Sequence, residues 1–127
     1  MIIEPPRKRP NNPEGWYPAI LDSVEFIPDV IYFDEMKDVV DIGFKLPHDG
    51  YITQRYNYSF YHKSNLYRVI VNVTGHKPDY DVGLDTEELI GEKCLIRIEH
   101  NEDSKGNVWE NVKEVKLFQE GMLKGEF

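Results

Sequence analysis

Apolar and polar residues alternate along several short segments of the chain, a two-residue period that is typical of strands with one buried face. The clearest alternation lies in residues 39–46, whose apolar face consists of Val40, Ile42, Phe44 and Leu46. Residues 47–50 have the composition of a turn. Residues 51–60 continue the alternation, with one face made of Ile52, Tyr56, Tyr58 and Phe60. The two segments therefore predict a β-hairpin.

A further strand is expected earlier in the chain, over residues 16–27. Its alternation places Ile20, Val24 and Phe26 on one side and Leu21, Ser23 and Glu25 on the other. Pro18 favours an edge position or a kink early in this strand, and Pro28 is expected to end it. The acidic residues 29–38 predict an irregular connection to the next strand.

One segment has the spacing of an amphipathic helix instead. Its apolar residues follow at intervals of three and four, namely Leu66, Val69, Ile70 and Val73. Ser64 suits the N-cap and Gly75 suits the C-terminal stop, while the β-branched residues favour a strand as the alternative. A single helical turn is expected at residues 85–88, which have the pattern of a capping box.

Two more strands are expected at residues 93–100 and 108–118, joined by the polar loop 101–107. The predicted order is therefore three strands, one helix and two strands. This is the order of an OB-fold, a five-stranded and partly open Greek-key barrel. We predict an all-β domain with one helix between strands 3 and 4, arranged as an OB-fold-like Greek-key barrel. Other small barrels and α+β sheets share the same element count.

The length of 127 residues suits one domain, and a composition of 40% hydrophobic and 30% charged residues suits a folded one. We expect this domain at residues 15–118, after a flexible, proline-rich arm at 1–14 and before a short tail at 119–127. The single cysteine, Cys94, excludes an internal disulfide framework and predicts a buried, inert thiol. Without a secretory signal or a long apolar run, the chain is expected in the cytoplasm with no membrane partner.

Charge is unevenly distributed along the chain, which has a net charge of −8. Residues 22–41 carry seven acidic residues and one basic residue, and residues 76–92 carry six and one. Residues 42–75 instead carry four basic residues against one acidic residue, together with seven of the sixteen aromatic residues. A basic, aromatic window in an acidic chain favours binding of single-stranded nucleic acid, because cations attract phosphates and flat rings stack on bases.

We expect this binding surface on the strands over residues 39–60, the usual nucleic-acid face of an OB-fold. The candidate binding residues are Lys45, Tyr51, Arg55, Tyr61, Lys63 and Trp109. The alternative is that the cations are ordinary solvated residues and that Trp109 packs in the core. The run Arg7-Lys8-Arg9 in the arm either reaches phosphates or is a solvated segment.

Sequence patterns of catalysis are missing. There is no G-x-x-x-x-G-K-[ST] loop, no G-x-G-x-x-G and no H-E-x-x-H motif. Asp79, Asp81 and Asp85 lack the glycine and glutamate that a calcium loop needs. We therefore expect no enzyme activity, no cofactor and no metal site; a metal-dependent nuclease is the least supported alternative.

Four stretches occur in a suggestive order: Gly15-Trp16-Tyr17-Pro18-Ala19, Ser64-Asn65-Leu66, Leu89-Ile90-Gly91-Glu92-Lys93-Cys94, and His100-Asn101-Glu102 with Gly106 and Asn111-Val112. In order and spacing the chain resembles a family of OB-fold single-stranded-DNA-binding proteins of bacteriophages and mobile elements. The resemblance implies an accessory role in phage replication or recombination, by binding without catalysis. Single-stranded DNA and replication or recombination proteins are the implied partners.

A homodimer is expected, because one small OB groove covers few nucleotides and pairing two grooves extends the site. The alternative function is a protein–protein interaction module that binds its partner through the acidic faces. The two hypotheses differ in which residues matter, since the first depends on the basic window and the second on the acidic residues within 29–41.

Overall fold

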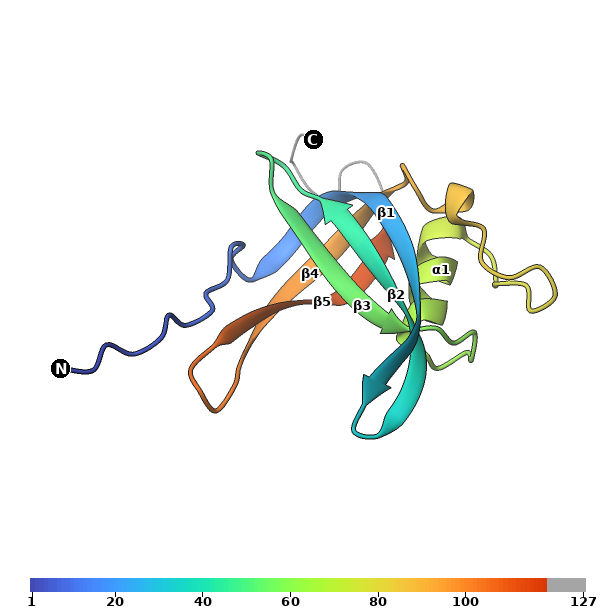
Figure 1. The fold of residues 1–127 in the computed structure, drawn as a ribbon. Coiled ribbons are helices and arrows are strands. Elements are labelled where there is room, and N and C mark those ends of the chain that lie inside the picture. Colours follow the sequence, from blue (N-terminus) through green and yellow to red (C-terminus); the bar gives the residue numbers. More distant parts are fainter. Residues whose placement is uncertain (119–127) are drawn as a thin grey trace.

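The computed structural model describes residues 1–118, which form one five-stranded antiparallel sheet and one α-helix (Figure 1). The elements are β1 (Gly15–Tyr32), β2 (Glu35–Lys45), β3 (Tyr51–Asn57), α1 (Asn65–Thr74), the 3₁₀ turn η1 (Thr86–Glu88), β4 (Lys93–Glu102) and β5 (Val108–Leu117). The strand order across the sheet is β3-β2-β1-β4-β5. The prediction of five strands with a helix between the third and the fourth is confirmed. The predicted tail at 119–127 lies outside the described residues.

β1 is the long strand that connects the two halves of the sheet. Its first residues pair with β4, from Gly15 to Ile20, and its later residues pair with β2, from Ile20 to Tyr32. Pro18 lies in the part of β1 that pairs with β4 and not with β2. One side of β1 is unpaired there, which suits proline because it has no backbone N–H to donate to a neighbouring strand.

A bulge in β1 changes the faces predicted for its side chains. The register with β2 shifts between Leu21 and Ser23, so that one extra residue enters β1 at that point. Leu21 is therefore fully buried in the core, although strict alternation placed it opposite Val24 and Phe26. The bulge turns Leu21 and Val24 to the same side, so that prediction was wrong for Leu21.

Residues 29–38 are not irregular, as the sequence suggested, but extend β1 and β2 into a projecting hairpin. Pro28 does not end the strand, because a second register shift between Ile27 and Val30 places it outside the ladder of backbone hydrogen bonds. Asp29, at φ 57°, donates its N–H to Asp38 Oδ1 at 3.1 Å. Phe33 and Asp34 form the two-residue loop, both with positive φ as a type I′ turn requires.

Helix α1 packs its apolar side against the sheet, and the strand alternative for this segment is wrong. Its buried residues are Leu66, Val69, Ile70 and Val73. Ser64 caps the helix by accepting the Tyr67 N–H, and Gly75 ends it in the left-handed conformation at φ 81°. Within residues 1–118, no helix is long and apolar enough to cross a membrane.

β3 is shorter than expected, because it ends at Asn57 instead of residue 60. Tyr56 is buried in the core, as predicted. Tyr58 leaves the sheet and joins a row of rings, with centroids 5.1 Å from Phe26 and 5.3 Å from Phe60. The connection from β3 to α1 is therefore held by ring packing against β1, together with one backbone hydrogen bond from Tyr58 N to Asp38 O of β2 at 2.9 Å.

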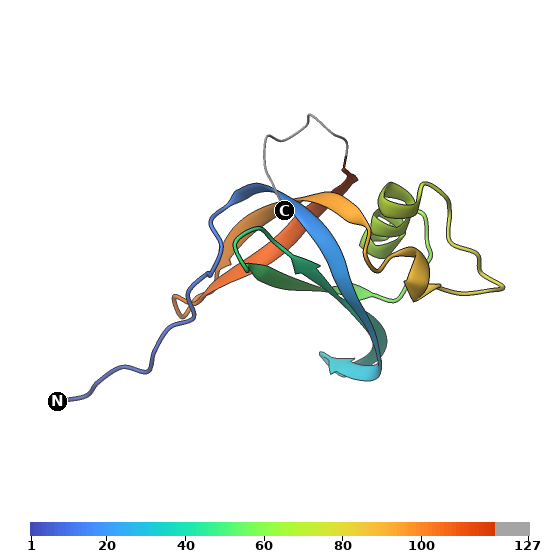
Figure 2. The same ribbon diagram turned by 90° about the horizontal axis from the view of Figure 1, so that it is seen from above.

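β3 and β5 are the two edges of the sheet and share no strand pairing, although the sheet curls so that they approach each other (Figure 2). Side chains connect them instead. Gln54 Oε1 accepts the Val112 N–H at 2.8 Å, and Asn12 Nδ2 donates to Tyr51 O at 3.3 Å and to Glu110 Oε2 at 2.9 Å. The sheet is thus open along this edge, and amide side chains bind the backbone groups that a closed barrel would pair.

Cys94 provides a chemical test of this core. The thiol is buried on β4, and burial raises its pKa to about 12, which disfavours the reactive thiolate. We expect no reaction of the native protein with Ellman's reagent at pH 8 and release of one thiol equivalent in denaturant. Rapid labelling of the native protein would show that the packing around β4 is different.

Candidate functional site

The six residues predicted from the sequence lie in four places on the structure. Lys45 and Tyr51 are paired at one end of the β2–β3 ladder, and Arg55 lies further along β3. Tyr61 and Lys63 are exposed in the connection between β3 and α1, and Trp109 is on β5. These residues do not share a single surface, and the contacts around them differ from one place to the next.

Tyr51 packs across the outer side of the sheet. Its ring lies over Gly43 on β2, where an added Cβ would come within 1.9 Å of the Tyr51 hydroxyl. The hydroxyl continues to β1, where it makes a 3.0 Å hydrogen bond with Ser23 Oγ. Tyr51 thus ties three strands together, and the absence of a side chain at Gly43 is what makes room for its ring.

Arg55 is already held by an acidic neighbour. Its Nε and Nη2 donate to the two carboxylate oxygens of Asp41 at 2.8 and 3.0 Å, and Nη1 lies 3.5 Å from Tyr32 Oη. The hydrogen bond to Asp41 is the main reason that the pKa of Arg55 is raised. Asp41 therefore offsets the charge of Arg55 on the outer face of β2 and β3, where the sequence predicted a nucleic-acid-binding residue.

A groove of about 620 Å³ lies between the tip of the β1–β2 hairpin and the start of α1. We call it the hairpin groove; its lining consists of Tyr32, Phe33, Lys37, Arg55, Tyr56, Asn57, Ser59, Lys63, Ser64 and Asn65. Three of these side chains are cationic and none is acidic. The predicted residues Arg55 and Lys63 are brought together here, with Lys37 as a third cation that the sequence analysis did not select.

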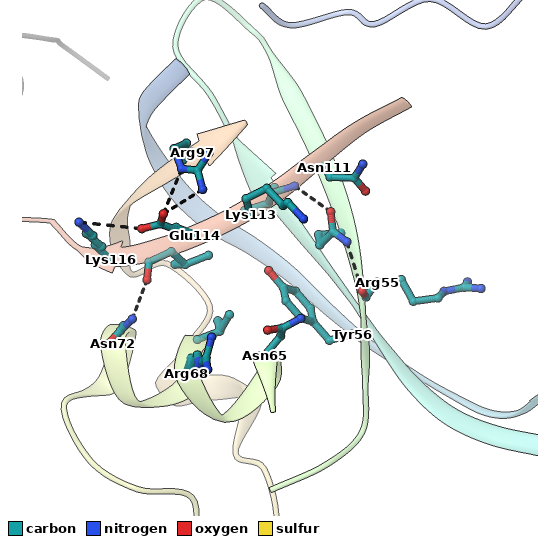
Figure 3. Close-up of a pocket in the computed structure, with 14 residues that line it drawn as sticks. Arg55, Tyr56, Asn65, Arg68, Asn72, Arg97, Asn111, Lys113, Glu114 and Lys116 are labelled. Carbon is teal, nitrogen blue, oxygen red and sulfur yellow. Dashed lines mark hydrogen bonds and ion pairs between the residues drawn. The ribbon is translucent and has the colours of Figure 1, made fainter. Parts of the chain in front are cut away.

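A second groove, of about 580 Å³, lies along the open edge between β3 and β5 with α1 beside it (Figure 3). We call it the edge groove; its lining consists of Gln54, Arg55, Tyr56, Asn65, Arg68, Val69, Asn72, Arg97, Asn111, Val112, Lys113, Glu114, Val115 and Lys116. Asn72 Nδ2 donates to Val115 O at 2.8 Å and joins the helix to β5.

The cations of the edge groove fall into two groups. Arg97 is bound by Glu114 at 2.9 Å and by Glu99 at 3.0 Å, and these hydrogen bonds raise its pKa. Arg68 on α1 and Lys113 on β5 are exposed and make no ion pair among the described residues. These two side chains come from different walls of the groove and are the ones available to an anionic ligand.

The hairpin groove and the edge groove form one basic track, because Arg55, Tyr56 and Asn65 line both. Seven of the fifteen basic residues of the chain line the track, and Glu114 is the one acidic residue that residues 1–118 contribute to it. Five of the seven were missed by the sequence analysis, namely Lys37, Arg68, Arg97, Lys113 and Lys116. Arg68 lies in the basic window, so composition was a signal for it; Lys113 reaches the track only because β5 approaches β3.

Trp109 and Tyr61 lie outside both grooves. Trp109 is 46% exposed, its Nε1 donates to Asp103 Oδ2 at 3.1 Å, and Lys8 Nζ lies 4.9 Å from the ring centroid. The Trp109 hydrogen bond is the main reason that the pKa of Asp103 is lowered to about 2. Tyr61 is exposed, and its ring lies beside that of His62, with ring centroids 4.6 Å apart. Trp109 is therefore fixed in orientation with its ring accessible.

Within residues 1–118, no group of three or more His, Cys, Asp or Glu side chains is placed to hold a metal ion. The histidines instead make local contacts: His76 Nε2 lies 2.8 Å from Glu88 Oε2, and His100 Nε2 lies 2.6 Å from Asn12 O. No protein-family model and no curated protein sequence matches the chain.

The close contact between Gly43 and Tyr51 allows the effect of a substitution on stability to be predicted. Gly43→Ala should lower the free energy of unfolding by about 1–3 kcal/mol, because the new methyl group overlaps the Tyr51 ring. The same substitution should cost clearly less in a Tyr51→Ala background, where the ring is gone. Urea denaturation of the four proteins of this double-mutant cycle measures the coupling. Equal costs in both backgrounds would mean that Ser23 Oγ, which the added Cβ also approaches to 2.4 Å, and not the Tyr51 ring sets the cost.

Proposed function

We propose that the protein binds single-stranded DNA, without catalysis, along the track formed by the hairpin groove and the edge groove. The observation that carries this proposal is the segregation of charge. Seven basic residues and, among the described residues, one acidic residue line the track, in a chain that has 23 acidic and 15 basic residues overall. Four of the seven are ion-paired, so the uncompensated charge of the track comes from Lys63, Arg68 and Lys113. An anionic polymer is attracted to this track and repelled by most of the remaining surface.

The track provides both contacts that single-strand binding needs. Arg68, Lys113 and Lys63 make no ion pair among the described residues, so phosphates need not displace a carboxylate from them. Phe33 at the hairpin tip is 98% exposed, and Tyr32 lies beside it in the lining of the hairpin groove. Stacking on such rings contributes about 1–3 kcal/mol per base, whatever the base.

The topology supports an OB-fold-like Greek-key barrel that is open between β3 and β5. β1 pairs with both β2 and β4, and the helix connects β3 to β4, as in that fold. Together with the resemblance of the sequence to phage and mobile-element proteins, this supports an accessory role in replication or recombination. The cytoplasmic location, the homodimer and the contacts with replication or recombination proteins are parts of the same proposal.

The alternative is a protein-interaction module, and one observation favours it. The β1–β2 hairpin exposes Ile31, Phe33 and Met36 next to Asp34 and Glu35. An apolar tip with an acidic rim would suit a partner that has an apolar pocket and basic surroundings. This function would survive the loss of cations from the track, and it would be abolished by charge reversal in the hairpin.

The two functions are separated by removing the two unpaired cations that come from different walls of the edge groove. Arg68→Ala with Lys113→Ala should weaken binding of labelled oligo-dT about tenfold at low salt, measured by fluorescence anisotropy. The slope of log Kd against log[salt] should fall by about 1.4, because each phosphate contact on a single strand contributes about 0.7.

The matched control is Lys77→Ala with Lys93→Ala, which removes the same charge from residues that line neither part of the track. The control should change Kd less than twofold. Equal losses in the two double variants would mean that net charge, not the edge groove, governs binding. Absence of binding by the wild-type protein at micromolar concentration and low salt would overturn the proposed function.

A further inference from the structure

Residues 7–12 of the arm that precedes β1 lie along the β4–β5 hairpin without regular secondary structure, whereas the first residues of the arm project away from the sheet (Figure 2). Val108 N donates to Lys8 O at 2.9 Å, and Lys8 N donates to Asn107 Oδ1 at 2.8 Å. Asn12 N donates to Glu110 Oε1 at 2.9 Å, and the Arg7 guanidinium donates to the Lys105 carbonyl. Hydrogen bonds from backbone and side-chain groups thus hold residues 7–12 against β5 and the loop before it.

This docking places the basic run of the arm beside Trp109. Lys8 Nζ lies 4.9 Å from the centroid of the Trp109 ring, the arrangement of a cation–π contact. Arg9 makes no ion pair among the described residues, and Arg7 pairs with the exposed Glu4 at 3.1 Å. An exposed ring and adjacent cations are the two components from which single-strand sites are built.

The Trp109 site lies on the same strip of β5 as the edge groove. Trp109 and Asn111 are two residues apart in a regular part of the strand, so their side chains point to the same side of it. Lys113 follows at a bulge, where the register with β4 shifts by one residue. Asn111 and Lys113 line the edge groove, and Trp109 continues the strip by about 7 Å beyond Asn111 at the usual rise per residue. A strand that leaves the edge groove along β5 would next meet Trp109 and the arm.

We propose that the docked arm is a second part of the nucleic-acid site, in which Lys8 and Arg9 contact phosphates and Trp109 stacks on a base. This inference rests on the proposed function, since it concerns the same bound strand. The arm site engages only strands long enough to extend past the edge groove. Shorter strands are held by the basic track alone.

The experiment compares two oligonucleotide lengths and two matched double variants. Binding of Lys8→Ala with Arg9→Ala is measured against oligo-dT of about 4 and about 16 nucleotides, which span the usual range of OB-fold sites. On the long oligonucleotide we expect Kd to rise about fivefold to tenfold and the salt slope to fall by about 1.4. On the short oligonucleotide, Kd should change less than twofold. The control, Lys77→Ala with Lys93→Ala, should change less than twofold on both.

Tryptophan fluorescence reports on the ring directly. In a Trp16→Phe background, Trp109 is the only tryptophan. Its emission should be quenched by the long oligonucleotide and not by the short one. Equal quenching by both lengths would contradict the placement of Trp109 beyond the edge groove.

The outcomes distinguish the arm site from the function on which it depends. If the long oligonucleotide binds the arm variant as tightly as the wild type, while Arg68→Ala with Lys113→Ala weakens binding, the arm site is wrong and the proposed function stands. An equal loss on short and long oligonucleotides would also overturn the arm site, because it would show a general effect of charge. If the wild-type protein binds neither oligonucleotide, both proposals fail.

Discussion

The edge strands β3 and β5 approach each other without forming a backbone ladder, and this unpaired edge shapes both the fold and the groove. Backbone groups at a sheet edge need partners, and here amide side chains provide them. Gln54 binds the backbone of β5, Asn72 joins α1 to β5, and Asn12 joins both edges. An amide side chain spans a longer distance than a direct backbone hydrogen bond between paired strands. The edge strands β3 and β5 therefore stay farther apart than paired strands and leave the edge groove between them.

The same opening explains why basic residues from distant parts of the chain share one surface. Arg55 comes from β3, Arg68 from α1 and Lys113 from β5, and the open edge is where these three elements meet. Acidic residues dominate the chain, but within the part that the structure describes they contribute only Glu114 to the lining. A net charge of −8 is therefore compatible with a locally positive groove, because at physiological salt charges interact over about 8 Å and not over the whole molecule.

The alternation of apolar and polar residues predicted strands and their buried faces correctly where strand pairing is regular. It gave wrong predictions where a bulge interrupts the pairing. Val40, Ile42 and Phe44 are buried as their spacing predicts, since β2 has no bulge in that region. Leu21 was assigned to the wrong face, because a bulge adds one residue and reverses the alternation that follows. The acidic hairpin after Pro28 was missed for a similar reason: a proline can sit in a bulge, where no ladder hydrogen bond is required of it.

The number and order of the strands, the helix with its caps, and the burial of Cys94 and Tyr56 could be predicted from the sequence, because they follow from local spacing and residue chemistry. Which residues form the candidate site depends on how distant segments of the chain pack together. Asp41 neutralises Arg55 through a register between β2 and β3, and Lys113 joins Arg68 through the approach of β5 to α1. Such neighbours are far apart in the chain, so no local pattern of residues can encode them.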